Sequence, residues 1–178
     1  MNELRVMTVN TKGGSRGKLP YYKHLIQTHD LDFLFLQETN ISTNYKAQQF
    51  LHELGVAKGI FSLGSTFKGT AIILTSNRWE ITRHMTDNIG GRIAIAEITN
   101  KYTTHTLVNI HAPAIELDRP NFYNTLANTL TGFKNIILGG DFNITLNDRD
   151  IVGTQIGTRR YGRAELQHII DAHDLKDS

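Results

Sequence analysis

The residues with the clearest chemical potential are Asp141 and Asn143, which follow an apolar run that stops at two glycines. The run Ile136–Leu138 is typical of a buried β-strand. In extended backbone, residues two apart face the same side, so we expect Asp141 and Asn143 to point together while Phe142 turns into the core. The pair would offer a carboxylate acceptor and an amide donor to one reacting group, and the glycines would allow a substrate to approach closely. This spacing predicts that a site begins where the strand ends.

Three other predicted strands also end in polar residues. These endings are Asn10 after Val9, Gln37 and Glu38 after Leu36, and His111 after Ile110. Ligand and catalytic groups in α/β sheets gather outside the carboxyl ends of strands, so the four endings are expected to share one cleft. Taken singly, Asn10 and His111 also have a structural explanation as turn or strand-end residues. The coincidence of all four supports the prediction of a site.

Short β-branched segments alternate with segments of helical period, which is typical of an α/β fold. Strands are predicted at Leu4–Val9, Leu31–Leu36, Gly59–Leu63, Thr70–Thr75, Trp79–Arg83, Arg92–Ile98, His105–Ile110 and Ile136–Leu138. Helices are predicted to begin at Pro20, at Ser42 or Thr43, and at Pro120, and a closing helix uses Leu166, Ile169, Ile170 and His173. Connections in the middle third are too short for crossover helices, so antiparallel hairpins are expected there. The mixture predicts two packed, mixed β-sheets with helices outside.

The length and composition favour a single-domain protein and exclude several classes of site. At 178 residues the chain has the length of one domain, and 19 Lys and Arg against 17 Asp and Glu leave a formal charge of only +2. The absence of cysteine excludes disulfides, thiolate catalysis and cysteine-ligated zinc. No apolar run has the length of a signal-peptide core or a membrane span, so we expect a soluble, intracellular protein, cytoplasmic or nuclear, without a membrane partner. The composition indicates no oligomeric state.

Two loops contain clustered cations. One holds Arg159, Arg160, Tyr161 and Arg163, and the other, just after Asn10, begins with Lys12. Arginine and lysine contact phosphates, and tyrosine stacks on bases, so both loops are predicted to bind nucleic acid. An ordinary solvated loop explains the same residues equally well.

The ordered motifs resemble those of the endonuclease/exonuclease/phosphatase superfamily, which includes apurinic-site endonucleases and bacterial exonuclease III. The motifs are Asn10, Gln37 to Thr39, Lys68 to Ala71, His111 to Pro113, and Gly140 to Asn143. Within that group, the compact spacing and the phrase from Asn109 to Pro113 most resemble the N-terminal endonuclease domain of LINE-type retrotransposon polyproteins. The resemblance implies a four-layer α/β sandwich, like that of DNase I, over residues 1–178.

The same resemblance implies a Mg²⁺-dependent phosphodiesterase that nicks DNA, with Mn²⁺ as a possible substitute. It makes Glu38 a ligand of the metal, with Asn10 close beside it. Asp141 would orient or deprotonate the attacking water, and Asn143 would hold the scissile phosphate. Mg²⁺ prefers oxygen ligands and neutralises charge that grows on phosphoryl oxygens, which suits these residue types.

Two departures from the family pattern matter. The family commonly has a phosphate-binding tyrosine where His111 stands, and histidine can also donate a hydrogen bond there. The family's later Asp and Ser-Asp-His motifs have no counterpart before Ser178, so we expect the C-terminal part of the domain to be missing. Two alternatives therefore stay open. The fold can act on another phosphodiester or phosphomonoester, such as RNA, a phosphoinositide or sphingomyelin, or the chain is an inactive remnant that binds nucleic acid or a partner.

Overall fold

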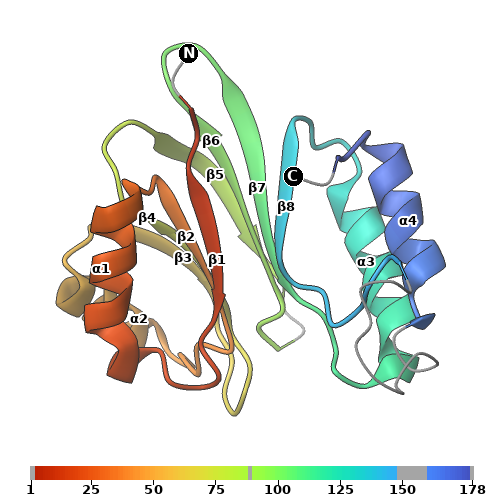
Figure 1. The fold of residues 1–178 in the computed structure, drawn as a ribbon, viewed down its shortest axis with the longest axis horizontal. Coiled ribbons are helices and arrows are strands. Elements are labelled where there is room, and N and C mark those ends of the chain that lie inside the picture. The colour runs from red at the N-terminus through yellow and green to blue at the C-terminus, as the bar shows by residue number, and fades with distance from the viewer. Residues whose placement is uncertain (1–2, 88–89, 148–159, 177–178) are drawn as a thin grey trace. The chain divides into compact units, whose positions relative to one another are not determined.

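The computed structural model describes residues 3–87, 90–147 and 160–176. The chain divides into two compact units, each considered by itself. The first comprises Met1–His111 and Ile137–Asp141, and the second comprises Ala112–Ile136 and Phe142–Ser178. That the two units make one domain remains a prediction. Figure 1 shows the order of their helices and strands.

The first sheet of the first unit has the strand order β1-β2-β4-β3. Its strands are β1 (Val6–Asn10), β2 (Phe33–Gln37), β3 (Lys58–Ser62) and β4 (Thr70–Leu74). Strands β1 and β2 are parallel, whereas β4 is antiparallel to both β2 and β3, so the sheet is mixed as predicted. The parallel register pairs Asn10 with Gln37. The carboxyl ends of β1 and β2 therefore lie side by side, which places Asn10 near Glu38.

Helices α1 (Leu19–His29) and α2 (Asn44–Leu54) cover the outer face of this sheet (Figure 1). Local signals explain the bounds of α2. The Thr43 side chain accepts a hydrogen bond from the Lys46 backbone N–H and caps the N-terminus, and Gly55 ends the helix at a φ of 85°. The predicted apolar face of α2 is confirmed, since Ala47, Phe50, Leu51 and Leu54 are all buried.

The second sheet has the order β5-β6-β7-β8. It comprises β5 (Glu80–Thr86), β6 (Ile93–Thr99), β7 (Thr104–His111) and β8 (Ile136–Asp141). Strands β5, β6 and β7 pair as consecutive antiparallel hairpins, and β3 pairs with β4 in the same way, which confirms the prediction of hairpins in the middle third except between β4 and β5, which lie in different sheets. The two sheets pack face to face around side chains that include Phe33, Phe35, Ile72, Ala96, Ile98 and Leu107. Because β2 lies between this core and the two helices, all five of its residues are buried.

Strand β8 differs from its prediction in burial. All six of its residues are partly exposed, although the apolar run Ile136–Leu138 is typical of a fully buried strand. The strand order explains the difference, because β8 stands at the end of the sheet and has a strand neighbour on one side only. The edge position also leaves its final residue, Asp141, accessible.

The second unit contains α3 (Arg119–Leu130) and α4 (Arg163–Ala172), which pack against each other. A short 3₁₀ turn, η2 (Glu116–Asp118), precedes α3. The predicted apolar face of α3 is confirmed, since Phe122, Leu126 and Leu130 are buried. That of α4 is confirmed in part, because Leu166 and Ile169 are buried whereas Ile170 is partly exposed and His173 lies past the end of the helix. The α/β class is therefore correct, with two mixed sheets and helices. Among the helices described, none combines the length and apolar character needed to cross a membrane.

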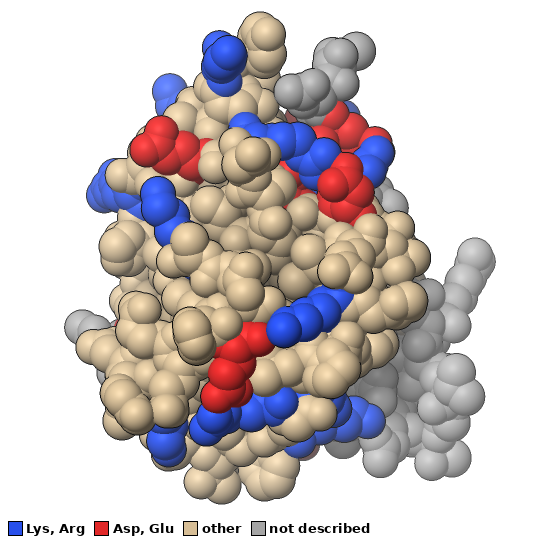
Figure 2. Space-filling model, turned by 90° about the vertical axis from the view of Figure 1, so that its left-hand side faces the viewer, with Lys and Arg blue, Asp and Glu red and all other residues tan. Residues whose placement is uncertain are grey.

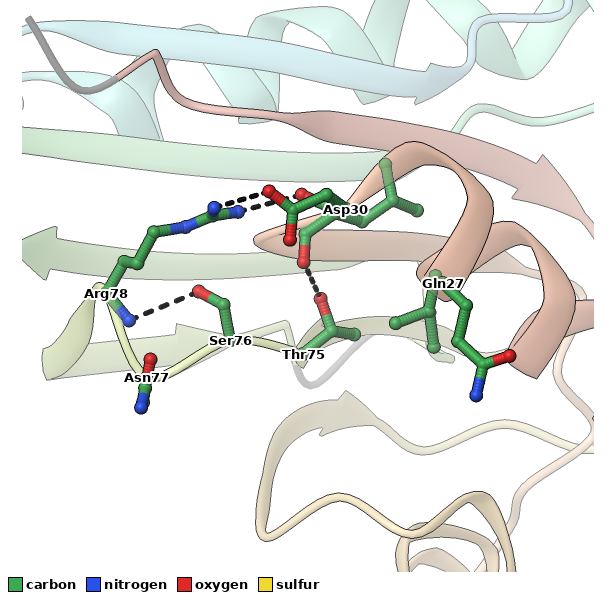
Figure 3. A pocket seen from close by; sticks show the side chains of 8 residues that line it. Gln27, Asp30, Thr75, Ser76, Asn77 and Arg78 are labelled. Atoms are coloured by element: carbon green, nitrogen blue, oxygen red, sulfur yellow. Dashed lines mark hydrogen bonds and ion pairs between the residues drawn. The ribbon is translucent and has the colours of Figure 1, made fainter.

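A buried carboxylate organises the end of the first sheet where β2 begins. Asp32 is fully buried and accepts hydrogen bonds from Arg5 N, Ser76 Oγ and Arg78 Nε at 3.0, 2.6 and 2.7 Å. Arg78 also pairs with Asp30, and these groups border a pocket of about 400 Å³ (Figure 3). The pocket lies at the opposite end of β2 from Glu38. Its charged groups are engaged with one another, so we assign this cluster a structural role.

We expect Asp32→Asn to lower the free energy of unfolding by about 2 kcal/mol, because hydrogen bonds to a charged acceptor are among the stronger ones. The amide of asparagine would point N–H groups at Arg5 N, Ser76 Oγ or Arg78 Nε, which are hydrogen-bond donors to the Asp32 carboxylate. Urea denaturation followed by circular dichroism measures the change. Asp171→Asn, on the exposed side of α4, is the matched control, and an equal effect of both substitutions would contradict the assignment.

Candidate functional site

The first unit brings together Glu38, His111 and Asp141. Each residue offers one metal-ligating atom, and the three atoms all lie within 4.8 Å of one another. Glu38 follows β2, and His111 and Asp141 are the last residues of β7 and β8. The expected convergence of strand endings therefore occurs for these three residues. Carboxylate oxygens and an imidazole nitrogen make a donor set that fits a divalent cation.

Asn10 links the two carboxylates. Its amide nitrogen donates to Glu38 Oε1 at 2.9 Å and to Asp141 Oδ2 at 2.8 Å. Its amide oxygen accepts from the Lys12 backbone N–H at 2.8 Å. In this arrangement the amide nitrogen faces the two carboxylates and positions them, and the predicted place of Asn10 in the metal site remains a prediction.

The backbone at Glu38 has an uncommon conformation. Its φ is 54°, in the left-handed region that non-glycine residues rarely occupy. Two contacts hold it there, since the Glu38 carbonyl accepts from Gly13 N at 3.1 Å and from Thr11 Oγ1 at 2.7 Å. Backbone held in this way is often found at functional sites. The turn directs a carboxylate to the sheet edge immediately after a fully buried strand.

His111 is almost fully enclosed, with a side chain only 7% exposed. Its Nε2 lies 3.7 Å from Glu38 Oε1, and its buried Nδ1 has no hydrogen-bond partner in the described part of the chain. Burial lowers the pKa of the His111 imidazole, and the positive charge of Arg92 lowers it further, whereas Asp141 and Glu38 oppose the shift. We therefore treat the ring as neutral at neutral pH, with one N–H donor and one nitrogen lone pair.

A buried pair of amides lies directly beneath these residues. Gln37 Nε2 donates to Asn109 Oδ1 at 2.7 Å and to Thr8 Oγ1 at 2.9 Å. Asn109 Nδ2 donates in turn to the carbonyls of Leu36 and Ala71 at 3.0 and 2.8 Å. These bonds join the first sheet to the second near the carboxyl ends of β2 and β7, where Glu38 and His111 are located. Sequence reasoning missed this positioning role, although an amide inside an apolar strand such as β7 is a usable signal.

The strand ending at Asp141 differs in two respects from the expected geometry. Asn143 has a φ of 50°, so Asp141 and Asn143 are not an extended pair facing one side. The reason is that β8 stops at Asp141 and the chain turns, with the Asn143 amide donating to the Ala112 carbonyl at 2.8 Å within the second unit. Phe142 is partly exposed rather than fully buried.

Gly140 is explained by packing between strands. A Cβ atom there would collide with the backbone of Ile110 in β7, and the residue has a φ of 131°. Only glycine therefore allows β8 to lie this close to β7 and brings Asp141 beside His111. The glycine serves strand packing, and the close approach of a substrate at this position stays a prediction.

The predicted nucleic-acid-binding residues fall in different places. Lys12 is exposed in the first unit, next to Asn10, and Arg160 and Tyr161 are exposed before α4 in the second unit. Arg163 donates to the carbonyl and the hydroxyl of Thr145, which gives it a structural contact. Arg159 lies outside the described residues. The nucleic-acid role of all of these side chains remains a prediction.

Comparison with known proteins agrees with this geometry. The sequence profile of the Endonuclease/Exonuclease/phosphatase family matches residues 7–175. The chain is also 28% identical over 153 residues to the "Transposon TX1 uncharacterized 149 kDa protein" of Xenopus laevis. That match covers 83% of this chain but only 12% of the transposon protein.

Solved structures share the fold at low sequence identity. An AP endonuclease from Archaeoglobus fulgidus has a TM-score of 0.75 at 15% identity, covering 96% of this chain and 71% of that one. The 3′ phosphatase NExo from Neisseria, bound to a product DNA hairpin, has a TM-score of 0.68 at 20% identity, covering 95% of this chain and 71% of that one. These similarities establish the fold.

Proposed function

Because the chain belongs to the Endonuclease/Exonuclease/phosphatase family, we propose that it is a divalent-metal-dependent phosphodiesterase that nicks DNA, as in target-site cleavage by LINE-type retrotransposons. The observation that supports this most directly is the grouping of Glu38, His111 and Asp141 ligand atoms within 4.8 Å. The similarity to a transposon protein and to a DNA-bound phosphatase favours DNA as the substrate.

The proposed metal is Mg²⁺, with Mn²⁺ as a substitute, held by the carboxylates of Glu38 and Asp141 with His111 beside them. When bound, such an ion neutralises the charge that develops on the phosphoryl oxygens. Oxygen ligands from two carboxylates are sufficient for Mg²⁺, which usually keeps several of its waters.

The protein side chains divide the remaining tasks. Asp141 accepts a hydrogen bond from the attacking water and orients or deprotonates it. The neutral His111 ring donates an N–H to a phosphate oxygen without adding charge. Asn10 keeps the two acids together through its contacts at 2.9 and 2.8 Å.

Supercoiled plasmid tests the proposal. We expect open-circular product when the protein is incubated with Mg²⁺ or Mn²⁺, and none when EDTA removes the ion. We expect Glu38→Gln to raise the Mg²⁺ concentration for half-maximal nicking by at least about tenfold, since loss of a ligand charge weakens metal binding. The exposed Glu80→Gln is the matched control. Nicking that is unaffected by EDTA would refute the proposal, and a folded protein that binds DNA but never nicks it would indicate an inactive remnant.

Asn10→Ala separates positioning from metal ligation. Because the amide only holds the carboxylates, we expect the nicking rate to fall by about 10- to 100-fold, the usual effect of losing a group that orients a metal ligand. Saturating Mg²⁺ should restore part of the rate, since both carboxylates are still present. The measurement is the nicking rate over a Mg²⁺ titration, and an unchanged titration curve would count against the positioning role.

A further inference from the structure

An exposed aromatic side chain stands on the loop between β3 and β4. Phe67 is 61% exposed, although it is a large apolar residue. Thr66 and Phe67 have φ values of 45° and 58°, so two successive non-glycine residues adopt the left-handed conformation. This is unfavourable, particularly for the β-branched Thr66, and persists only where surrounding contacts enforce it.

Asn40 holds this loop through its side chain and its backbone. Asn40 Oδ1 accepts from the Phe67 backbone N–H at 2.6 Å, and Asn40 Nδ2 donates to the Gly13 carbonyl at 3.1 Å. The Asn40 backbone N–H donates to the Lys68 carbonyl at 2.9 Å. Asn40 thus joins the loop after β1, its own loop after β2 and the loop before β4.

The Phe67 ring rests against the loop after β1. A Cβ atom added at Gly13 would lie 3.5 Å from the nearest ring atom, so the Phe67 ring lies beside Gly13 with room for about one carbon atom between them. Gly13 N in turn donates to the carbonyl of Glu38, two residues before Asn40. We call Gly13, Asn40 and Phe67 the Phe67 platform. The platform is anchored to the same backbone turn that presents the Glu38 carboxylate.

Exposed cations flank the Phe67 platform. Lys12 precedes Gly13 and Lys68 follows Phe67, and both side chains are exposed. Lys and Arg side chains gather along the lower part of the face in Figure 2, at the end of the first unit where β1 finishes. An aromatic face between lysines matches the alternation of base and phosphate in a nucleic acid strand. The lysines disfavour an apolar protein segment as the occupant.

We propose that the Phe67 ring of this platform stacks on an unpaired nucleobase of the DNA that enters the Glu38 site. Lys12 and Lys68 would then lie near the phosphates of that DNA strand. This rests on the proposed function and adds a preference in substrate structure. Both faces of a base inside an intact duplex are covered by neighbouring bases, so a side chain can stack fully only on a base that has left the helix. The protein should therefore favour DNA that is unpaired or distorted beside the scissile bond.

The test uses a duplex oligonucleotide with a short unpaired bubble containing 2-aminopurine, and a fully paired duplex of the same sequence, both in EDTA so that no cleavage occurs. For the wild type we expect tighter binding to the bubble and a change in 2-aminopurine fluorescence on binding. Phe67→Ala should weaken bubble binding by about tenfold, as loss of one stacked base predicts, and leave duplex binding unchanged. Phe67→Trp should retain both the affinity and the fluorescence change.

Tyr102→Ala is the matched control, because Tyr102 is 80% exposed in the turn between β6 and β7, at the start of β7 rather than at its His111 end. Equal bubble affinity of wild type and Phe67→Ala would overturn the inference, as would an equal loss in Tyr102→Ala. These results do not depend on catalysis. Plasmid nicking measured separately with Mg²⁺ tests the proposed function, so each can fail alone.

Discussion

Asp141→Asn is expected to lower the rate of plasmid nicking by about 10²- to 10⁴-fold at neutral pH with saturating Mg²⁺, the usual contribution of a general base. An amide cannot accept a proton from the attacking water, and it removes one negative charge from the proposed metal site. The side-chain oxygen of asparagine can still accept from the Asn10 amide, so the local arrangement should persist. The measurement is the initial rate of conversion of supercoiled to open-circular plasmid.

The control for this substitution is Asp171→Asn, since Asp171 is exposed on α4 and pairs only with Gln167 in the described contacts. Its rate should match the wild type. Circular dichroism should show the same fold for both variants. If Asp141→Asn nicks DNA as fast as the wild type, Asp141 has no role in activating water.

Asn109→Ala is expected to produce the largest loss of stability, about 3 kcal/mol or more, because each buried polar group left without a partner costs about 1 to 3 kcal/mol. Asn109 is fully buried and makes three hydrogen bonds, to Gln37 and to the carbonyls of Leu36 and Ala71. Urea denaturation measures the change.

Asn77→Ala, at an exposed turn, is the corresponding control and should alter stability little. Asn109→Ala should also slow nicking under conditions in which it remains folded, because Glu38 follows directly after Gln37. A variant as stable as the wild type would show that the amide pair does not hold the two sheets together.

Features set by neighbouring residues were predictable from the sequence. The α2 helix has its cap at Thr43 and its stop at Gly55, both of which act over a few residues. The hairpins of β5, β6 and β7 follow from short connections. The convergence of Glu38, His111 and Asp141 was also predictable, because it depends only on strand ends meeting at one edge of the fold.

Features that depend on distant partners were not predictable. The Asn10 amide binds a carboxylate 131 positions away, a contact that no local sequence pattern indicates. The turn at Asn143 replaced the expected extended geometry because β8 ends two residues earlier. The left-handed backbone at Glu38 likewise depends on the Gly13 and Thr11 contacts.

The choice of an amide at position 10 has an electrostatic consequence. The Glu38 and Asp141 carboxylates have oxygen atoms within 4.8 Å of each other, and two negative charges at this distance repel. A lysine at position 10 would hold the two carboxylates together only by cancelling much of their charge. Asn10 holds the two carboxylates together with a neutral amide group, so their negative charge is not cancelled and remains available to attract a cation. If the proposed metal binds here, its carboxylate ligands are already held together by Asn10, and the ion does not have to gather them against their mutual repulsion.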